Sequence, residues 1–251
     1  MGGLRIAIAA LIVAASAATA RSEEIKVLST PTLKGSLNEL APAFTRATGH
    51  TLTLTFEGVP ALKRQIETGE AFDLAILLPA TVDDLAREGK IVAGTRTDVA
   101  RTAAGVAIRS GAPQPRVDSA EALKETLLAA KTIAYSRDSA SGNYLLQLFD
   151  RLGIANEVKP RLVAVTGRNP VEAVARGDAE LTVITVPNIV GVDGVALAGL
   201  LPEELQNYTT FSAGLSAGAK APKAAQQFVT FLRSPAAAVV VRSKGLDPLT
   251  P

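Results

Sequence analysis

Residues 53–91 contain a strand, a turn, a helix and a second strand in close succession, and this order restricts the fold strongly. Polar and apolar residues alternate over 53–56, Gly58-Val59-Pro60 predicts a turn, and a helix is expected over 61–68. A continuous apolar strand is expected over 73–78. Such a unit places the N-terminus of its helix at the carboxyl edge of a sheet, where free N–H groups favour an anion or a polar ligand.

The alternation of strands and helices continues from residue 25 to residue 186. Helices are expected where apolar residues recur every three or four positions, and several end at a glycine, as at Gly49, Gly89 and Gly153. Repeated units of this kind predict an α/β fold with parallel, doubly wound sheets in one or two lobes.

The first 20 residues have the pattern of a secretory signal peptide. Arg5 precedes an apolar run over 6–15, and Ala18-Thr19-Ala20 provides small residues before a cleavage site near Ala20/Arg21. The apolar run is too short for a typical membrane span, which disfavours the alternative of a retained anchor. We therefore expect an exported, periplasmic protein.

The composition argues against several classes of function. The chain has 26 basic and 24 acidic side chains, and loss of Arg5 leaves a net charge of +1, so no nucleic-acid partner is expected. Cysteine is absent, which excludes disulfides and thiolate metal sites. The single histidine, His50, follows a helix stop and is interpreted as a surface turn residue. No nucleophile, phosphate-loop or zinc motif is present, so we expect no enzyme activity, no metal and no cofactor.

Two segments resemble a known family. Residues 224–249 are similar to the closing segment of periplasmic binding-protein chains. Residues 56–73 are similar to the segment F-x-G-S-G-x-L-x-x-Q-I-x-x-G-x-x-x-D of the periplasmic molybdate-binding proteins, with matches at Phe56, Gly58, Ala61, Leu62, Gln65, Ile66, Gly69 and Asp73. The chain thus resembles the solute receptors of ABC transporters with the type II periplasmic binding fold.

This resemblance implies two lobes, each with a doubly wound sheet, and a ligand cleft between them. Lobe 1 would hold residues 25–104 and 212–251, and lobe 2 residues 105–207, with hinges near 103–104 and 208–211. The resemblance also implies a monomeric receptor that delivers a molybdate-like oxyanion or another small anionic solute to an ABC permease in the inner membrane.

Candidate ligand-binding residues lie in five loops that follow strands. Hydroxyls and backbone N–H groups at helix starts are neutral donors, which suit a desolvated oxyanion. By the resemblance, the candidates in lobe 1 are Ser29, Thr30, Thr32, Gly58 and Val59. Those in lobe 2 are Ser139, Ala140, Ser141, Gly142, Asn143, Asn169, Val171 and Thr185, with Arg137 as a candidate charge partner.

The usual ligand residues are replaced at two of these positions. Val59 stands where the family has a serine, and Thr185 where it has a tyrosine. Glu57 would repel an oxyanion if its carboxylate faced the cleft. Ordinary structural roles also remain open, such as an N-cap at Asn169 and a structural hydrogen-bonding role for Asp73. The alternative functions are a sensor or accessory protein with the receptor fold and, less favoured, an exported α/β hydrolase.

Overall fold

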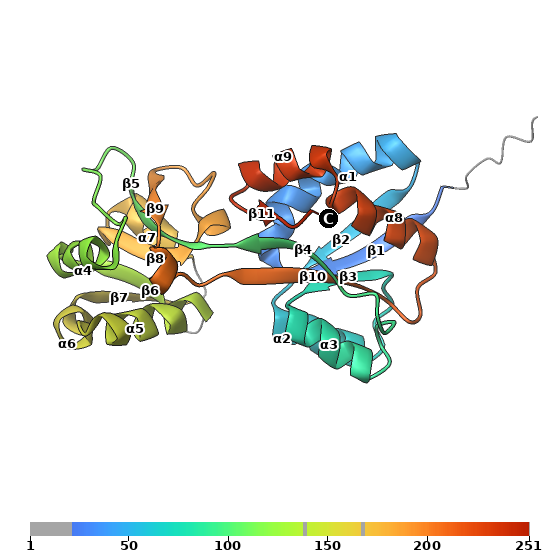
Figure 1. Ribbon diagram of the computed structural model, residues 1–251, viewed down its shortest axis with the longest axis horizontal. Helices are drawn as coiled ribbons and strands as arrows, with labels where there is room; N and C mark the ends of the chain where they lie inside the picture. Colours follow the sequence, from blue (N-terminus) through green and yellow to red (C-terminus); the bar gives the residue numbers. More distant parts are fainter. Residues whose placement is uncertain (1–21, 138–139, 167–168, 251) are drawn as a thin grey trace, which may run out of the picture.

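Two β-sheets lie side by side in the computed structural model, each with helices packed on its faces (Figure 1). The structure describes residues 22–137, 140–166 and 169–250. The predicted signal peptide, its cleavage site at Ala20/Arg21 and the candidate Ser139 lie outside these described residues. Within these ranges, none of the helices has the length and apolar character that a membrane crossing requires.

The six-stranded sheet and its helices form lobe 1. Strand β1 pairs in parallel with β2 and β3, whereas β10 runs antiparallel to β3 and β4. The strand order is β11-β4-β10-β3-β1-β2, with bounds β1 Glu24–Ser29, β2 Thr51–Phe56, β3 Leu74–Leu77, β4 Thr97–Thr102, β10 Thr209–Leu215 and β11 Asp247–Pro248.

Helices cover both faces of this sheet because successive side chains of its strands point to opposite sides. Val27 belongs to the core under one set of helices, and the adjacent Leu28 belongs to the core under the other set. The first set is α1 Lys34–Thr48, α8 Pro222–Leu232 and α9 Pro235–Ser243, and the second is α2 Val59–Glu67 and α3 Pro79–Arg87 (Figure 1).

The five-stranded sheet and its helices form lobe 2. Strand β6 is parallel to β7 and β8, and β5 is antiparallel to β8 and β9. The order is β7-β6-β8-β5-β9, with bounds β5 Ala104–Arg109, β6 Ile133–Ser136, β7 Leu162–Val165, β8 Leu181–Thr185 and β9 Val195–Leu200. The helices are α4 Ala120–Ala129, α5 Ala140–Leu152, α6 Ala155–Val158 and α7 Pro170–Arg176. The prediction of a two-lobed α/β fold is confirmed, and antiparallel strands adjoin the parallel ones in both sheets.

The chain crosses between the two sheets twice. Strand β4 leads into β5 through Ala103 alone, and β10 begins the return at Thr209. Gln206 joins the two crossings, because its side chain accepts a hydrogen bond from Ala104 N at 2.7 Å and donates to Ala104 O at 3.2 Å. The Arg101 guanidinium also lies 4.4 Å from the centre of the Tyr208 ring. The two crossings are therefore tied to each other where the lobes meet.

His50 is buried, with 7% of its surface exposed, so its interpretation as a surface turn residue was wrong. Its Nδ1 accepts a hydrogen bond from Glu23 N at 3.1 Å, and its ring stacks on Phe44. The position after the helix stop was predicted from sequence, but the hydrogen-bond partner of the ring comes from the segment just before β1. His50 therefore has a structural role.

Asp73 is a buried carboxylate that joins three separate segments of lobe 1. Its Oδ2 accepts from Lys26 N at 2.8 Å, and its Oδ1 accepts from Lys220 N at 2.7 Å and Ala221 N at 3.0 Å. The last two N–H groups immediately precede α8, so the carboxylate also interacts favourably with the helix N-terminus. The predicted structural hydrogen-bonding role of Asp73 is confirmed.

We expect Asp73→Ala to lower the free energy of unfolding by about 3 kcal/mol, because three backbone N–H groups, of which that of Ala221 is buried, lose a charged acceptor. Denaturant unfolding followed by circular dichroism measures this loss. The control is Asp118→Ala, whose side chain is largely exposed and whose replacement should change stability by less than about 0.5 kcal/mol. Equal losses for the two variants would contradict the role assigned to Asp73.

Candidate ligand-binding site

Three helices of lobe 1 begin at one edge of its sheet without a side-chain cap. Thr30 precedes the 3-10 turn η1 Pro31–Leu33, which continues directly into α1. Gly58 precedes α2 and Leu78 precedes α3, and neither of these nor Thr30 makes a side-chain cap hydrogen bond. Because β1, β2 and β3 are neighbouring parallel strands, the helix starts that follow them lie at a common edge. Free N–H groups of three helix N-termini are thus gathered there.

Among the described helix starts elsewhere, those of α4, α7 and α9 have side-chain caps, whereas that of α6 has none. Ser119 Oγ accepts from Ala122 N at the start of α4, and Ser234 Oγ accepts from Ala237 N at the start of α9. The Asp73 carboxylate lies near the start of α8, where it accepts from Lys220 N and Ala221 N just before the helix. The chain thus caps some helix starts with side chains, and the starts of α1, α2 and α3 lack such caps together at one sheet edge.

Two hydroxyl groups at the same edge are buried without a hydrogen-bond partner among the described residues. Ser29 is fully buried and Thr30 is 5% exposed, and their Oγ and Oγ1 atoms make no hydrogen bond there. A buried hydroxyl without a partner costs about 1–3 kcal/mol. These two candidates are therefore donors that the fold positions at a cost and does not itself use. Thr32, in η1, is partly exposed.

In lobe 2, Asn188 connects two of the predicted candidates. Its Nδ2 donates to Thr185 Oγ1 at 2.7 Å, and its backbone O accepts from Asn169 Nδ2 at 3.2 Å. Asn169 Oδ1 in turn accepts from Val171 N at 3.1 Å and caps α7. The amide of Val171 is therefore already used. Sequence reasoning missed Asn188, which lies in the 3-10 turn η3 Val186–Asn188 that follows β8.

The other lobe 2 candidates lie around the start of α5, directly after β6. Ala140 is the first residue of α5, but its side chain lies outside the described part of the structure. Gly142 is buried, Ser141 is partly exposed, and Asn143 and Arg137 are exposed. Arg137 lies in the turn after β6, and its backbone N donates to Val165 O at 3.3 Å.

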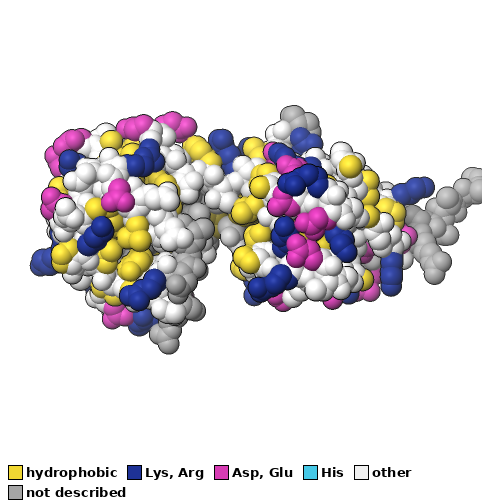
Figure 2. Space-filling model, turned by 90° about the horizontal axis from the view of Figure 1, so that it is seen from below, with side chains coloured by type: hydrophobic (Ala, Val, Ile, Leu, Met, Phe, Trp, Pro, Cys, Tyr) yellow, Lys and Arg dark blue, Asp and Glu magenta, His cyan; other side chains and the backbone are white. Residues whose placement is uncertain are grey.

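The two groups of candidates approach each other where η1 of lobe 1 contacts η3 of lobe 2. Thr185 pairs with Ala104 across the β8–β5 ladder, so it lies beside a crossing between the lobes. A groove separates the lobes on the face shown in Figure 2. The fold thus brings the loops after β1 and β8 together. Gly58 and Val59 follow β2, the strand that pairs with β1, so their loop is next to the loop after β1.

Glu57 is the carboxylate nearest in the chain to these donors. Its backbone N donates to Ser29 O at 3.2 Å, which places it beside the buried hydroxyls. Its Oε2 accepts from Gln65 Nε2 at 2.9 Å, so α2 holds the side chain. The amide of Gln65 thus offsets part of the negative charge that an anion would meet at this edge.

A family model for bacterial extracellular solute-binding proteins matches residues 25–247. This chain belongs to that family. The match spans both sheets and both crossings, so it covers the whole arrangement described above, and it confirms the resemblance to periplasmic binding proteins that the sequence indicated.

The names of individual relatives of this solute-binding protein state different activities and ligands. It is 29% identical to an aconitate isomerase from a Pseudomonas species, over 99% of this chain and 95% of that protein. It is 26% identical to a molybdate-binding protein from Rhodobacter capsulatus, over 82% of this chain and 81% of that protein. The substrate-binding domain of a provisionally assigned molybdenum ABC transporter from Clostridium difficile has the same fold, with a TM-score of 0.79, 19% identity, and coverage of 91% of this chain and 100% of that one.

This solute-binding protein also has hollows away from the region where η1 and η3 meet. One of about 490 Å³ lies at the end of β5 opposite the crossing, where Arg109 and Glu180 contribute to its lining. Among the described residues, no group of three or more His, Asp or Glu side chains could hold a metal ion.

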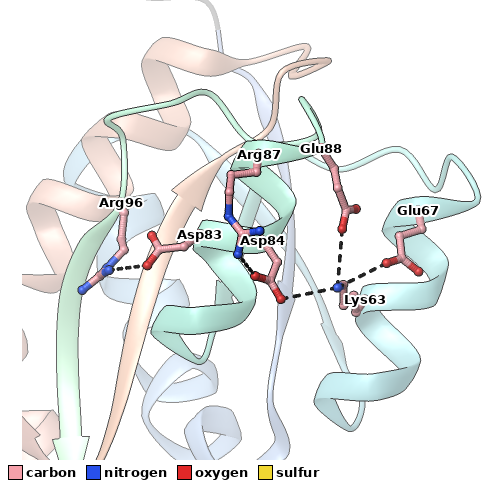
Figure 3. Close-up of polar contacts among 7 residues, drawn as sticks. All are labelled: Lys63, Glu67, Asp83, Asp84, Arg87, Glu88 and Arg96. Carbon is pink, nitrogen blue, oxygen red and sulfur yellow. Dashed lines mark hydrogen bonds and ion pairs between the residues drawn. The ribbon is translucent and has the colours of Figure 1, made fainter.

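Helix α2, whose N-terminus lies at the candidate site, is joined to α3 by a network of ion pairs. Lys63 Nζ lies 3.5 Å from carboxylate oxygens of Glu67, Asp84 and Glu88 (Figure 3). Although desolvation lowers the pKa of Lys63, the carboxylates of Glu88, Glu67 and Asp84 together raise it above its ordinary value. Basic and acidic side chains therefore alternate over this part of lobe 1 (Figure 2).

We expect Lys63→Met to lower the unfolding temperature at low salt, because Glu67 and Glu88 lose their shared cation beside Asp84, which keeps only Arg87. The deficit should shrink at about 1 M salt, where the screening length falls to about 3 Å. Thermal unfolding at both salt concentrations measures the difference. The exposed Lys223 of α8 supplies the control, Lys223→Met, and a salt-independent deficit for Lys63→Met would contradict the network's role.

Proposed function

We propose that this solute-binding protein binds a small anionic solute between its lobes and delivers it to an ABC permease in the inner membrane. The observation that carries the proposal is the pair of buried, unpartnered hydroxyls of Ser29 and Thr30 beside uncapped helix starts. An anion that accepted hydrogen bonds from these groups would use donors whose burial already costs free energy. The predicted signal peptide supports a periplasmic location, and we propose that the receptor acts as a monomer.

The replaced ligand positions favour an anion other than molybdate as the solute. Val59 offers no hydroxyl, and the hydroxyl of Thr185 reaches less far than that of a tyrosine. Two relatives bear names that refer to different anions, molybdate and aconitate. A small carboxylate is therefore the first class of solute to test, with Arg137 as its candidate charge partner, and tetrahedral oxyanions are the second.

We also propose that the lobes move relative to each other when the solute binds. The boundaries would be residues 25–104 and 212–251 for lobe 1 and residues 105–207 for lobe 2, with hinges near 103–104 and 208–211. The single residue between β4 and β5 supports the first hinge, since it joins two strands that belong to different sheets. The solute would then be enclosed by donors from both lobes.

Calorimetric titration with aconitate, citrate, molybdate, tungstate and sulfate tests the proposal. We expect one of these anions to bind, and Ser29→Ala and Thr30→Val each to weaken binding about tenfold or more, as for the loss of a hydrogen bond to a charged group. Neither substitution should lower the unfolding temperature of the free protein, because neither hydroxyl has a partner to lose.

Thr182→Val is the matched control. Thr182 is also fully buried, but its Oγ1 donates to Ala134 O at 2.8 Å. This variant should lose about 1 kcal/mol of stability and keep its affinity for the anion. No binding across the panel would reject the anionic solute, and unchanged affinity in both hydroxyl variants would reject the site. If the wild type binds an anion but does not support its uptake with a permease, a sensor or accessory role is favoured instead.

A second candidate function is the isomerisation of a small unsaturated carboxylate. The observation that favours it is the 29% identity with an aconitate isomerase over nearly the whole chain. Such a reaction removes a proton from one carbon and returns one to another, so it needs a base close to the solute. Glu57 lies beside Ser29 and leaves Oε1 outside its hydrogen bond with Gln65, which makes it the candidate base.

Glu57→Gln separates the two functions. In a receptor, loss of this negative charge should tighten anion binding severalfold, corresponding to about 1 kcal/mol. In an isomerase, the same change should abolish the interconversion of cis- and trans-aconitate while binding persists, which proton NMR measures directly. Glu70→Gln removes an equal charge near Lys26 at the other end of β1 and serves as the control. No interconversion by the wild type would reject the isomerase.

A further inference from the structure

The hydroxyl of Thr185 has its hydrogen-bonding direction set by Asn188. Because Asn188 Nδ2 donates to Thr185 Oγ1 at 2.7 Å, the threonine oxygen is an acceptor in this contact. A hydroxyl has one proton, and the proton of Thr185 is not used in accepting this bond. It can therefore be donated to another group. Thr185 is partly exposed, so a solute can reach it.

The backbone around Asn188 is held from both lobes. Within lobe 2, Ile189 N donates to Val186 O at 2.9 Å, and Val186 N donates to Ala103 O at 3.0 Å in the crossing. From lobe 1, the turn at Gly245 lies so close that a Cβ there would be 2.6 Å from Val186 Cγ1. These contacts hold the backbone of the η3 turn, from which the Asn188 side chain reaches Thr185.

The backbone O of Asn188 can only accept a hydrogen bond, so it determines that Nδ2 of Asn169 is the side-chain atom that faces it. This backbone O accepts from Asn169 Nδ2, and Asn169 Oδ1 accepts from Val171 N. Asn188 thus accepts through its backbone O and donates through its side-chain Nδ2, and Thr185 Oγ1 is the acceptor of that donation. An anion is an acceptor, so a hydroxyl prepared as a donor is the form that it would bind.

We propose that Asn188 is a positioning residue that prepares the Thr185 hydroxyl to donate to the bound anion. This inference rests on the proposed function, because it assigns a role within the same site. It explains how a threonine serves at a position where the family resemblance places a tyrosine: the short hydroxyl is oriented by a neighbour. The same fixed polarity disfavours a solute that can only donate at this point, such as an ammonium group.

A double-mutant cycle with the anion that binds most tightly in calorimetry tests this inference. We expect Thr185→Val to weaken binding about tenfold and Asn188→Ala to weaken it severalfold. In the Thr185→Val background, Asn188→Ala should cause no further loss, because the hydroxyl that it orients is gone. Additive losses in the double variant would overturn the inference.

Asn188→Asp provides a readout that a purely structural role would not change. The carboxylate would accept the Thr185 proton and add a negative charge, so binding should weaken more than in Asn188→Ala. Asn156→Asp adds the same charge on the exposed surface of α6 and should leave affinity unchanged. If Asn188→Ala fails to fold, Asn188→Ser retains a donor, and the same cycle with Thr185→Val should again show no further loss.

The outcomes separate this inference from the proposed function. If the wild type binds no anion, both are overturned. If the wild type binds an anion and Ser29→Ala weakens binding while Asn188→Asp does not, the receptor stands and the role of Asn188 is overturned. Thermal unfolding of each variant shows whether a loss of binding reflects loss of the fold.

Discussion

The parallel pairing of β1 with β2 and β3 is the constraint on which the candidate site depends. Parallel neighbours require helical crossovers, and every crossover returns a helix N-terminus to the same edge of the sheet. The starts of α1, α2 and α3 therefore gather without side-chain caps. Beside them lie the buried hydroxyls of Ser29 and Thr30, which the rest of lobe 1 does not pair. The fold thus accumulates donors in one place, which is the property that an anion receptor needs.

Lobe 2 contributes further donors at this edge, and the two crossings between the sheets determine where they lie. Gln206 ties these crossings together, and the β8–β5 pairing sets Thr185 beside one of them. As a result, η1 and η3 meet although about three-fifths of the chain separates Leu33 from Val186. The contact between Gly245 and Val186 shows how closely the lobes approach at this point. Donors from both lobes can therefore face a single solute, which is the physical basis of the proposed binding between the lobes.

Local patterns predicted most of the fold, and their failures have physical causes. The helices and the parallel strands follow from periodicity and glycine stops, but β10 was not predicted because Phe211–Gly214 is buried on both faces and its sequence does not alternate. His50 was misjudged because its hydrogen-bond partner is the backbone N of Glu23, which lies 27 residues away just before β1. Asn188 was missed because nothing in its local sequence marks it. Its importance comes from Thr185 and Asn169, which only the folded turn brings within hydrogen-bonding distance.

The amino-acid sequence by itself determined the α/β class, the family and the loops in which hydroxyl groups follow strands. These properties depend on periodicity, turn residues and short motifs, all of which are local. Only the tertiary structure decided which of those donors are already used and which are free. Asp73 meets Lys220 across 147 residues, and Glu57 is held by Gln65 on the next helix, whereas Ser29 and Thr30 find no partner among the described residues. A hydrogen bond is a relation between two groups in space, so its presence cannot be read from either group alone.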